Sequence, residues 1–231
     1  MANRPWRPGK LASLAPLGLV IAAPGGALQQ ARVAWSPCHR LIAREYANEN
    51  LFERLTANTS YAVLGDEVRA LREIADLTNG VRAETGLIAA AFAFPGRPSR
   101  FSDGSRGAYY AARALETAIA EVAYHDARVL RGAGACVIEK SVIEATLDGT
   151  LVDIRGGRPA PAGVYHDTDY IVGQRLGGLV RELGGDGIAY DSVRHAGGAC
   201  AAVFRAEVLR DARAVRTIRF AWDGMALHKA P

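Results

Sequence analysis

The sequence predicts an α+β fold, a single domain built on a largely antiparallel sheet. Two observations lead to this prediction. Strand-like and helix-like stretches follow one another irregularly, without the regular βαβ repeats of a doubly wound parallel sheet. In addition, Asp148 and Gly149 form a strong hairpin-turn signal inside residues 134–154, which predicts two strands that pair antiparallel there.

The first 30 residues are expected to form a tail, and residues 31–231 a single domain. The tail begins with basic residues and an apolar run, as a signal peptide does. Pro16 and Pro24 interrupt the run, which is too short to span a bilayer. We therefore expect a tail that packs on the domain and a protein without a membrane span.

Elements up to the middle of the chain follow from local patterns. Residues 31–43 resemble a short strand with Arg40 near its end. Residues 48–57 and 65–78 have helical spacing. The apolar run 86–94 is expected to be a strand, since prolines and glycine end it and a polar loop, 99–107, follows.

The remaining elements are expected from residue 107 onwards. A short strand at 107–112 leads into a helix at 114–127. A second helix is expected at 167–183, with Asp167 or Thr168 as its N-cap. The late strands are expected at residues 187–195, 200–208 and 215–223.

Composition sets bounds on function. The net charge of +4 is too small to predict nucleic-acid binding by itself. Lys10, Lys140 and Lys229 are the only lysines, so nearly all basic residues are arginines, whose planar fork suits phosphate oxygens. A GC-rich genome would give the same bias, so single arginines must be judged by their surroundings.

Cysteine and histidine spacing argues against metal and disulfide frameworks. The three cysteines, Cys38, Cys136 and Cys200, are odd in number, widely spaced and in no CxxC pair. Reduced thiols in a cytoplasmic protein fit this pattern best. The five histidines have no metal-ligand spacing, so no metal is expected.

Glu121 is the candidate functional residue of the helix 114–127. Ala114 and Ala118 lie before it on the same side, which leaves room for a ligand, and His125 lies one turn after it. Glu116, near the helix start, complements the helix dipole and is expected to be structural. From helix geometry alone, a functional carboxylate and a surface ion pair with His125 are about equally supported.

Two further segments allow a functional and a structural interpretation. The loop that contains Arg97, Arg100 and Arg106 could wrap phosphate, or could be a polar loop without a ligand. Ser192 is expected in a strand, where a lone serine is usually structural. No GxSxG elbow surrounds it, and no GxxxxGK[ST] pattern is present, so a hydrolase triad and a P-loop are not predicted.

Three stretches together resemble the RES-domain toxin family, named for an Arg, a Glu and a Ser: "CHRLI", "SRFSDGSRGAYYAARALETAIAEVAYH" and "YDSVRHAGGACAAVFR". The resemblance covers most of residues 31–224, including the "WDG" that begins at Trp222. Phe101 stands where many members have tryptophan. The residues that match the family pattern are Arg40, Arg100, Tyr110, Glu121 and Ser192.

The resemblance implies a fold like that of ADP-ribosyltransferases, NAD as the substrate, and catalysis by Arg40, Glu121 and Ser192. Arg40 and Arg100 would hold the NAD pyrophosphate bidentately. Tyr110 would contact the nicotinamide ribose, Glu121 would stabilise the ribosyl cation, and Ser192 would position the ligand. The family also implies an antitoxin partner with an Xre-type helix-turn-helix or related domain, expected to block the active site.

Three other functions remain open at this level. The same fold could transfer ADP-ribose to a host protein instead of cleaving NAD. A toxin that acts on nucleic acid is less well supported, because lysine is scarce and no nuclease set or aromatic–basic platform is visible. A catalytically silent interaction module is least supported, because all five pattern residues are present.

Overall fold

The computed structural model describes residues 26–44, 83–93 and 98–230. These residues form a seven-stranded sheet with the order β1-β2-β5-β4-β3-β6-β7. Every pairing is antiparallel except that of β3 with β4. The strands are β1 (Gln29–Ala43), β2 (Tyr109–Ala112), β3 (Cys136–Asp153), β4 (Gly187–Asp191), β5 (Ala199–Val203), β6 (Leu209–Trp222) and β7 (Leu227–Lys229).

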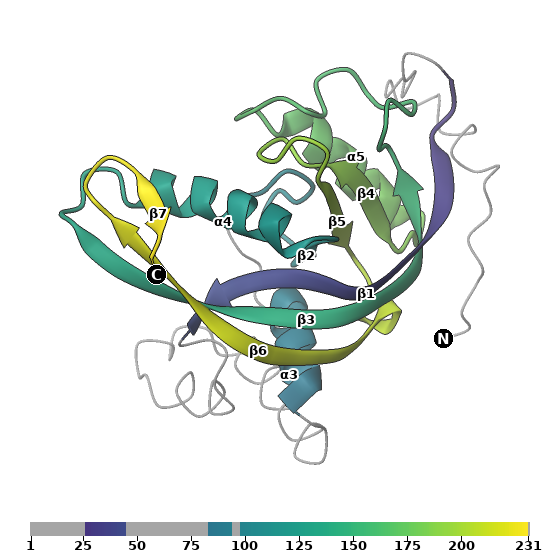
Figure 1. The fold of residues 1–231 in the computed structure, drawn as a ribbon. Coiled ribbons are helices and arrows are strands. Elements are labelled where there is room, and N and C mark those ends of the chain that lie inside the picture. The colour runs from purple at the N-terminus through teal and green to yellow at the C-terminus, as the bar shows by residue number, and fades with distance from the viewer. Residues whose placement is uncertain (1–25, 45–82, 94–97, 231) are drawn as a thin grey trace, which may run out of the picture.

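The sheet curls so that five strands close on themselves. β1 pairs with β3 along most of its length and also with β2, through His39 and Ala112. The pairings β2–β5, β5–β4 and β4–β3 complete the ring. β6 pairs with β3 on the edge opposite β1, and β7 pairs with β6, so the long strands β1, β3 and β6 form a curved platform (Figure 1).

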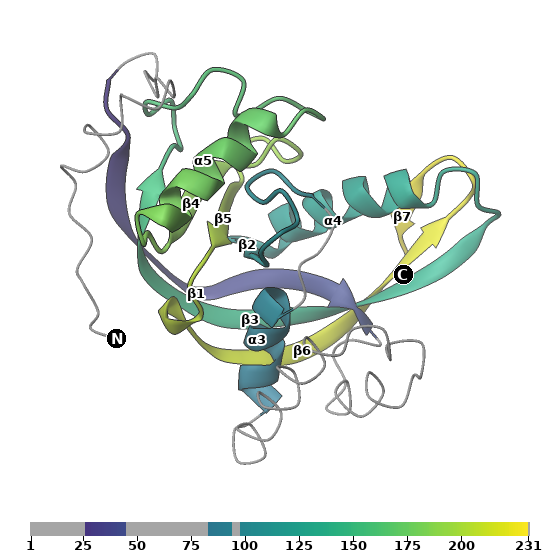
Figure 2. The ribbon, with the colours of Figure 1, turned by 180° about the vertical axis from the view of Figure 1, so that it is seen from behind.

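Helices cover both faces of this platform. α4 (Leu115–Val129) and α5 (Ile171–Glu182) lie on one side, and α3 (Ala83–Ala93) lies on the other (Figures 1 and 2). Two hydrophobic cores result. The first contains Ala118 of α4 and Leu176 of α5, and the second contains Ile88 of α3. A short 3-10 turn, Ala206–Val208, joins β5 to β6.

This architecture confirms the predicted α+β fold class with a largely antiparallel sheet. The helix expected at 114–127 is α4, and the strands expected near 31–43 and 107–112 are β1 and β2. The predicted helices at 48–57 and 65–78 and the predicted tail lie wholly or mostly outside the described residues. Within those residues, no helix is both long enough and apolar enough to cross a membrane.

The structure corrects the prediction for 86–94. The run "GLIAAAFAF" was expected to be a strand, but Ala83–Ala93 is helical and packs Ile88 into the second core. A short apolar run fits a buried strand and a buried helix equally well, because periodicity alone cannot separate them. Gly107 lets the following loop approach this helix, since a Cβ there would lie 2.2 Å from the carbonyl oxygen of Ala91.

The predicted hairpin at Asp148 and Gly149 is also wrong, because both residues lie inside the continuous strand β3. They pair with Ala34 and Val33 of β1, and Asp148 binds Arg32 through two hydrogen bonds of 2.9 Å. A Cβ on Gly149 would come within 3.0 Å of the Val208 side chain. The glycine therefore serves close packing inside a strand rather than a turn.

Three smaller predictions also differ from the structure. α5 begins at Ile171 with Tyr170 as its N-cap residue, not Asp167 or Thr168. Ser192 lies just after β4, which ends at Asp191, rather than within the strand. The stretch 200–208 is a strand only as far as Val203.

Candidate functional site

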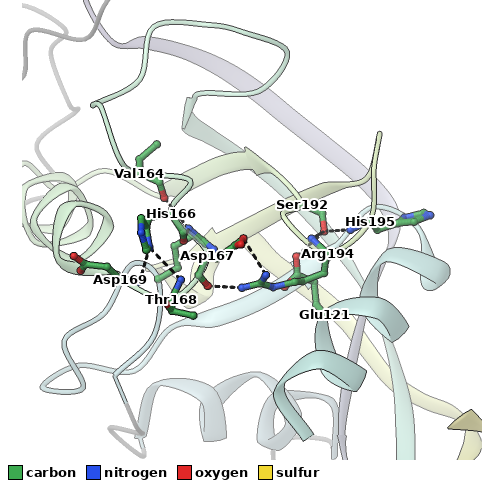
Figure 3. A network of polar contacts seen from close by, with 10 residues as sticks. Glu121, Val164, His166, Asp167, Thr168, Asp169, Ser192, Arg194 and His195 are labelled. Carbon is green, nitrogen blue, oxygen red and sulfur yellow. Dashed lines mark hydrogen bonds and ion pairs between the residues drawn. The ribbon is translucent and has the colours of Figure 1, made fainter. Parts of the chain in front are cut away.

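Glu121 of α4 and Ser192, just after β4, form the centre of the site. Ser192 Oγ donates a hydrogen bond of 2.6 Å to Glu121 Oε1 (Figure 3). Ser192 Oγ also accepts hydrogen bonds from the backbone N–H groups of Arg194 and His195, at 3.1 and 3.0 Å. A hydroxyl has one proton and two acceptor positions, so the two N–H groups orient the proton toward the carboxylate.

The turn that carries Ser192 is fixed against α4. Its backbone is closed by Ser192 N–H to Gly198 O, at 2.8 Å, and Gly198 N–H to His195 O, at 2.9 Å. His195 Nδ1 lies 2.8 Å from the hydroxyl of Thr117, a fully buried residue of α4. A Cβ on Gly198 would lie only 2.6 Å from that hydroxyl oxygen, so the turn and the helix touch closely. The serine and the glutamate are thus placed by one packed unit.

Two buried side chains, those of Cys200 and Tyr190, interact electrostatically with Glu121. Cys200 Sγ lies 4.0 Å from Glu121 Oε1, and burial, with the nearby carboxylate as a second cause, raises the pKa of this thiol to about 12. Burial also raises the pKa of Tyr190, which the charge of Glu121 raises further and that of Arg100 lowers. Both groups stay neutral at ordinary pH, so neither supplies a charge that would pair with the Glu121 side chain.

Arg100 is buried, with only 8% of its surface exposed. Its Nη1 donates to the carbonyl oxygens of Val164 and His166, at 2.8 and 2.9 Å. Its guanidinium lies 4.9 Å from the centre of the Tyr170 ring. The guanidinium therefore holds the segment before α5 in place, and its charge acts on the same tyrosine, Tyr190, as that of Glu121.

The hydroxyl of Tyr110 organises the loop that carries Arg100. It accepts the N–H of Phe101 at 3.0 Å and lies 2.8 Å from Ser99 Oγ. The pKa of Tyr110 is raised by burial, and the hydrogen bond with Ser99 opposes that rise. Tyr110 and Arg100 consequently belong to one structural unit, with β2 as its base.

Two glycines of α5 bring the helix backbone against this unit. A Cβ on Gly173 would lie 2.2 Å from the carbonyl oxygen of Arg100. A Cβ on Gly177 would lie 2.1 Å from that of Phe101. Only glycine permits such an approach, so contact with α5 fixes the position of the loop that carries Arg100.

Arg40 points to the opposite face of the sheet from Glu121. Alternate residues of a strand face opposite sides, and Cys38 belongs to the second core while Leu41 belongs to the first. The guanidinium of Arg40 lies 4.8 Å from the centre of the Tyr109 ring and donates to the carbonyl oxygen of Tyr110 at 3.3 Å. Burial lowers its pKa.

Arg194 is a member of the network that the sequence did not single out. Its Nη1 lies 3.1 Å from Asp167 Oδ1, and its Nη2 donates to the carbonyl oxygen of Asp167. The guanidinium carbon lies 3.4 Å from the centre of the Tyr124 ring. The sequence signal was the arginine two positions after Ser192, but an arginine in a polar turn is too common to stand out.

The structure therefore brings four of the five predicted residues into one region: Arg100, Tyr110, Glu121 and Ser192. Arg40 reaches that region only through the backbone of Tyr110. The alternative of a surface ion pair for Glu121 is not what the geometry shows, because in the described part of the chain Glu121 bonds Ser192 and makes no ion pair with His125.

The family model for the RES domain matches residues 79–223. The chain belongs to the RES-domain family. The matched stretch contains Arg100, Tyr110, Glu121 and Ser192 and begins after Arg40.

One similar solved structure is a chain of the MbcT–MbcA toxin–antitoxin complex of M. tuberculosis. It is 14% identical, with a TM-score of 0.45, and the alignment covers 81% of this chain and 86% of that chain. None of the curated protein sequences compared with this RES-domain chain matches it.

Replacing Arg100 with lysine is expected to lower the thermal stability of the protein and, if the chain binds NAD as the family resemblance implies, to weaken that binding. Lysine keeps the charge, but it cannot lie flat on Tyr170 and reach both carbonyl oxygens with the geometry of a planar fork. A loss of about 1–3 kcal/mol in the free energy of unfolding is expected for buried, charge-assisted hydrogen bonds. Urea unfolding and calorimetric titration with NAD measure the two effects.

The matched control is Arg32→Lys, at an arginine whose side chain is 72% exposed and pairs with Asp148. It should change neither quantity appreciably, because exposed ion pairs contribute little. Full retention of stability and NAD affinity in Arg100→Lys would show that only the charge of Arg100 matters.

Proposed function

We propose that this RES-domain chain is the toxin of a toxin–antitoxin system and that it cleaves the bond between nicotinamide and ribose in NAD. The observation that best supports this is the hydrogen bond of 2.6 Å from Ser192 to Glu121, in a chain of this family. It presents an oriented carboxylate beside buried neutral groups.

Cleavage of NAD needs a stabiliser of positive charge more than a general acid. The nicotinamide ring is cationic in NAD and leaves as a neutral molecule, so no proton has to be given to the leaving group. The ribose that remains develops oxocarbenium character, as in glycoside hydrolysis. A fixed carboxylate such as Glu121 stabilises that charge or binds the ribose hydroxyls, and little reorganisation is needed because Ser192 already holds it.

Ser192 acts in this proposal as a positioning group rather than as a nucleophile. Its proton already points at Glu121, and its lone pairs accept two backbone N–H groups. Both lone pairs of the oxygen are therefore engaged, so it is poorly placed to attack the ribose carbon. Removing the serine hydroxyl would leave the carboxylate free to rotate.

Two of the remaining predicted residues, Arg100 and Tyr110, border the proposed binding surface for NAD. Arg100 and Tyr110, joined through the 99–101 loop, lie beside the region of Glu121 and contribute positive charge and an aromatic ring. The direct contact of Arg40 with pyrophosphate stays a prediction, since its guanidinium contacts Tyr109 and the backbone of Tyr110. We propose that Arg40 supports the site through that backbone contact.

A product analysis tests the proposed function. The purified chain, free of any partner, is incubated with NAD in water and, separately, with phosphate, and the products are identified by mass. We expect free nicotinamide together with ADP-ribose or its phosphorylated form. ADP-ribose attached to a protein would indicate a transferase instead, and unchanged NAD would overturn the proposal.

We also propose an antitoxin partner that blocks the site, as the family resemblance implies. An enzyme that drains NAD in the cytoplasm would harm the cell that makes it, so an inhibitor must accompany it. A carboxylate on the partner, expected to carry an Xre-type helix-turn-helix or related domain, could occupy the place that we propose for the phosphate groups of NAD. Inhibition of this kind would compete with NAD.

A further inference from the structure

Arg194 combines three features that single it out among the arginines of the site. Its side chain is 11% exposed, whereas that of its partner Asp167 is 69% exposed. Its guanidinium carbon lies over the Tyr124 ring, at 3.4 Å from the ring centre. Figure 3 shows Arg194 between Asp167 on one side and the Ser192–Glu121 pair on the other. A rigid arginine thus presents its donors to an exposed, replaceable carboxylate.

The other two arginines are committed to the protein backbone. Arg100 donates to the carbonyl oxygens of Val164 and His166, and Arg40 donates to that of Tyr110. Those carbonyls lie in the main chain, so a ligand could replace them only if the chain moved. Arg194 also donates to the backbone oxygen of Asp167, but its Nη1 binds a side-chain carboxylate that can rotate away into solvent.

We propose that Arg194 is a binding residue for the phosphate groups of the substrate, and that the Asp167 carboxylate occupies its place in the free protein. Carboxylate and phosphate oxygens fit the same arginine donors. The Asp167 carboxylate is exposed to water, which weakens its attraction to Arg194, so a ligand with two negative phosphates can displace it. This inference rests on the proposed function, because it assigns a further contact to the NAD pyrophosphate.

The position of Arg194 links this contact to the catalytic pair. Its own backbone N–H donates to Ser192 Oγ at 3.1 Å, and its side chain rests on Tyr124 of the helix that carries Glu121. A phosphate bound at Arg194 would therefore be held by the same turn that orients the serine. The side chain can be changed without removing that N–H, so binding and chemistry can be tested separately.

Two substitutions with opposite expected effects test the proposal. Arg194→Gln should raise the dissociation constants of both NAD and inorganic pyrophosphate about tenfold, as expected for loss of a charge-assisted hydrogen bond. Asp167→Asn should lower both constants about two- to fivefold, because it removes a weakly held competitor. Calorimetric titration of the full chain with each probe, and initial rates with NAD, give these values.

The matched controls break a comparable pair elsewhere. Arg32 and Asp148 also form an Asp–Arg pair, with hydrogen bonds of 2.9 Å, but in the β1–β3 ladder. Arg32→Gln and Asp148→Asn should leave both dissociation constants and the rate unchanged. Thermal unfolding of each variant checks that it remains folded, and the Asp167 side chain is 69% exposed, so Asp167→Asn removes no buried packing.

The outcomes separate this inference from the proposed function. If Asp167→Asn weakens binding as Arg194→Gln does, the ion pair serves to hold the structure of the site together and the proposal is overturned. If NAD is cleaved but both variants bind like the unchanged chain, this inference fails alone. If pyrophosphate binding responds as expected while NAD stays intact, the proposed function fails and the phosphate site stands.

Discussion

Replacing Glu121 with glutamine should lower the rate of nicotinamide release from NAD by about a hundredfold or more, the usual effect of removing a fixed group that stabilises transition-state charge. Glutamine has nearly the same shape, and its carbonyl oxygen can still accept the hydroxyl proton of Ser192. The substitution therefore removes the negative charge and leaves the hydrogen bond. Initial rates at saturating NAD measure the effect.

Glu116→Gln is the matched control, because Glu116 is an exposed glutamate in the first turn of the same helix. It should leave the rate nearly unchanged, and unfolding curves of both variants should stay close to that of the unchanged chain. Equal rates in the two variants would rule out Glu121 as the charge stabiliser. A collapse of the Glu121→Gln unfolding transition would instead assign the residue a structural role.

The largest expected effect on stability comes from Gly177→Ala. The new methyl carbon would lie 2.1 Å from the carbonyl oxygen of Phe101 and 2.8 Å from its carbon, so the backbone itself would have to move. We expect a loss of about 3 kcal/mol in the free energy of unfolding, at the upper end of the usual cost of overpacking. Urea unfolding followed by circular dichroism measures it.

Gly178→Ala, at the next position of α5, is the control. No heavy atom lies within 4 Å of a Cβ built there, so alanine fits and should stabilise the helix by up to about 1 kcal/mol. Adjacent substitutions of the same kind should thus have opposite signs. A similar effect of both would mean that α5 does not lie against the Arg100 loop as the structure shows.

The elements predicted well from the sequence are those with a clear period or a clear end. α4 has a regular apolar stripe, and the predicted range 114–127 differs from the observed Leu115–Val129 by at most two residues. The prediction of a strand at 86–94 was wrong because apolar residues lie on all sides of α3, so no helical period marks it in the sequence. The burial of this helix follows from its packing against the sheet rather than from any local pattern. The prediction of a turn at Gly149 was wrong because the residue that requires a glycine there, Val208, is distant in the sequence.

The candidate site, too, could be predicted only in part from the sequence. The family pattern identified Glu121 and Ser192, and the structure places them in hydrogen-bond contact. Which way Arg40 faces could not be predicted, because a bulge between Trp35 and Cys38 shifts the register of β1 just before it. The ion pair between Asp167 and Arg194 could not be predicted either. As an acidic residue before a helix it resembled an N-cap, but its carboxylate pairs with Arg194.

The ring of strands described above has a consequence for the time at which the candidate site is assembled during synthesis of the chain. β1 leaves the ribosome early, but its long partner is β3, and β4 and β5 must still arrive to connect β3 with β2. Pairings between such distant segments make folding slow, since chain entropy is lost before the contacts form. Glu121 can meet Ser192 only after the chain has been made as far as β5, so a shorter nascent chain carries no assembled site.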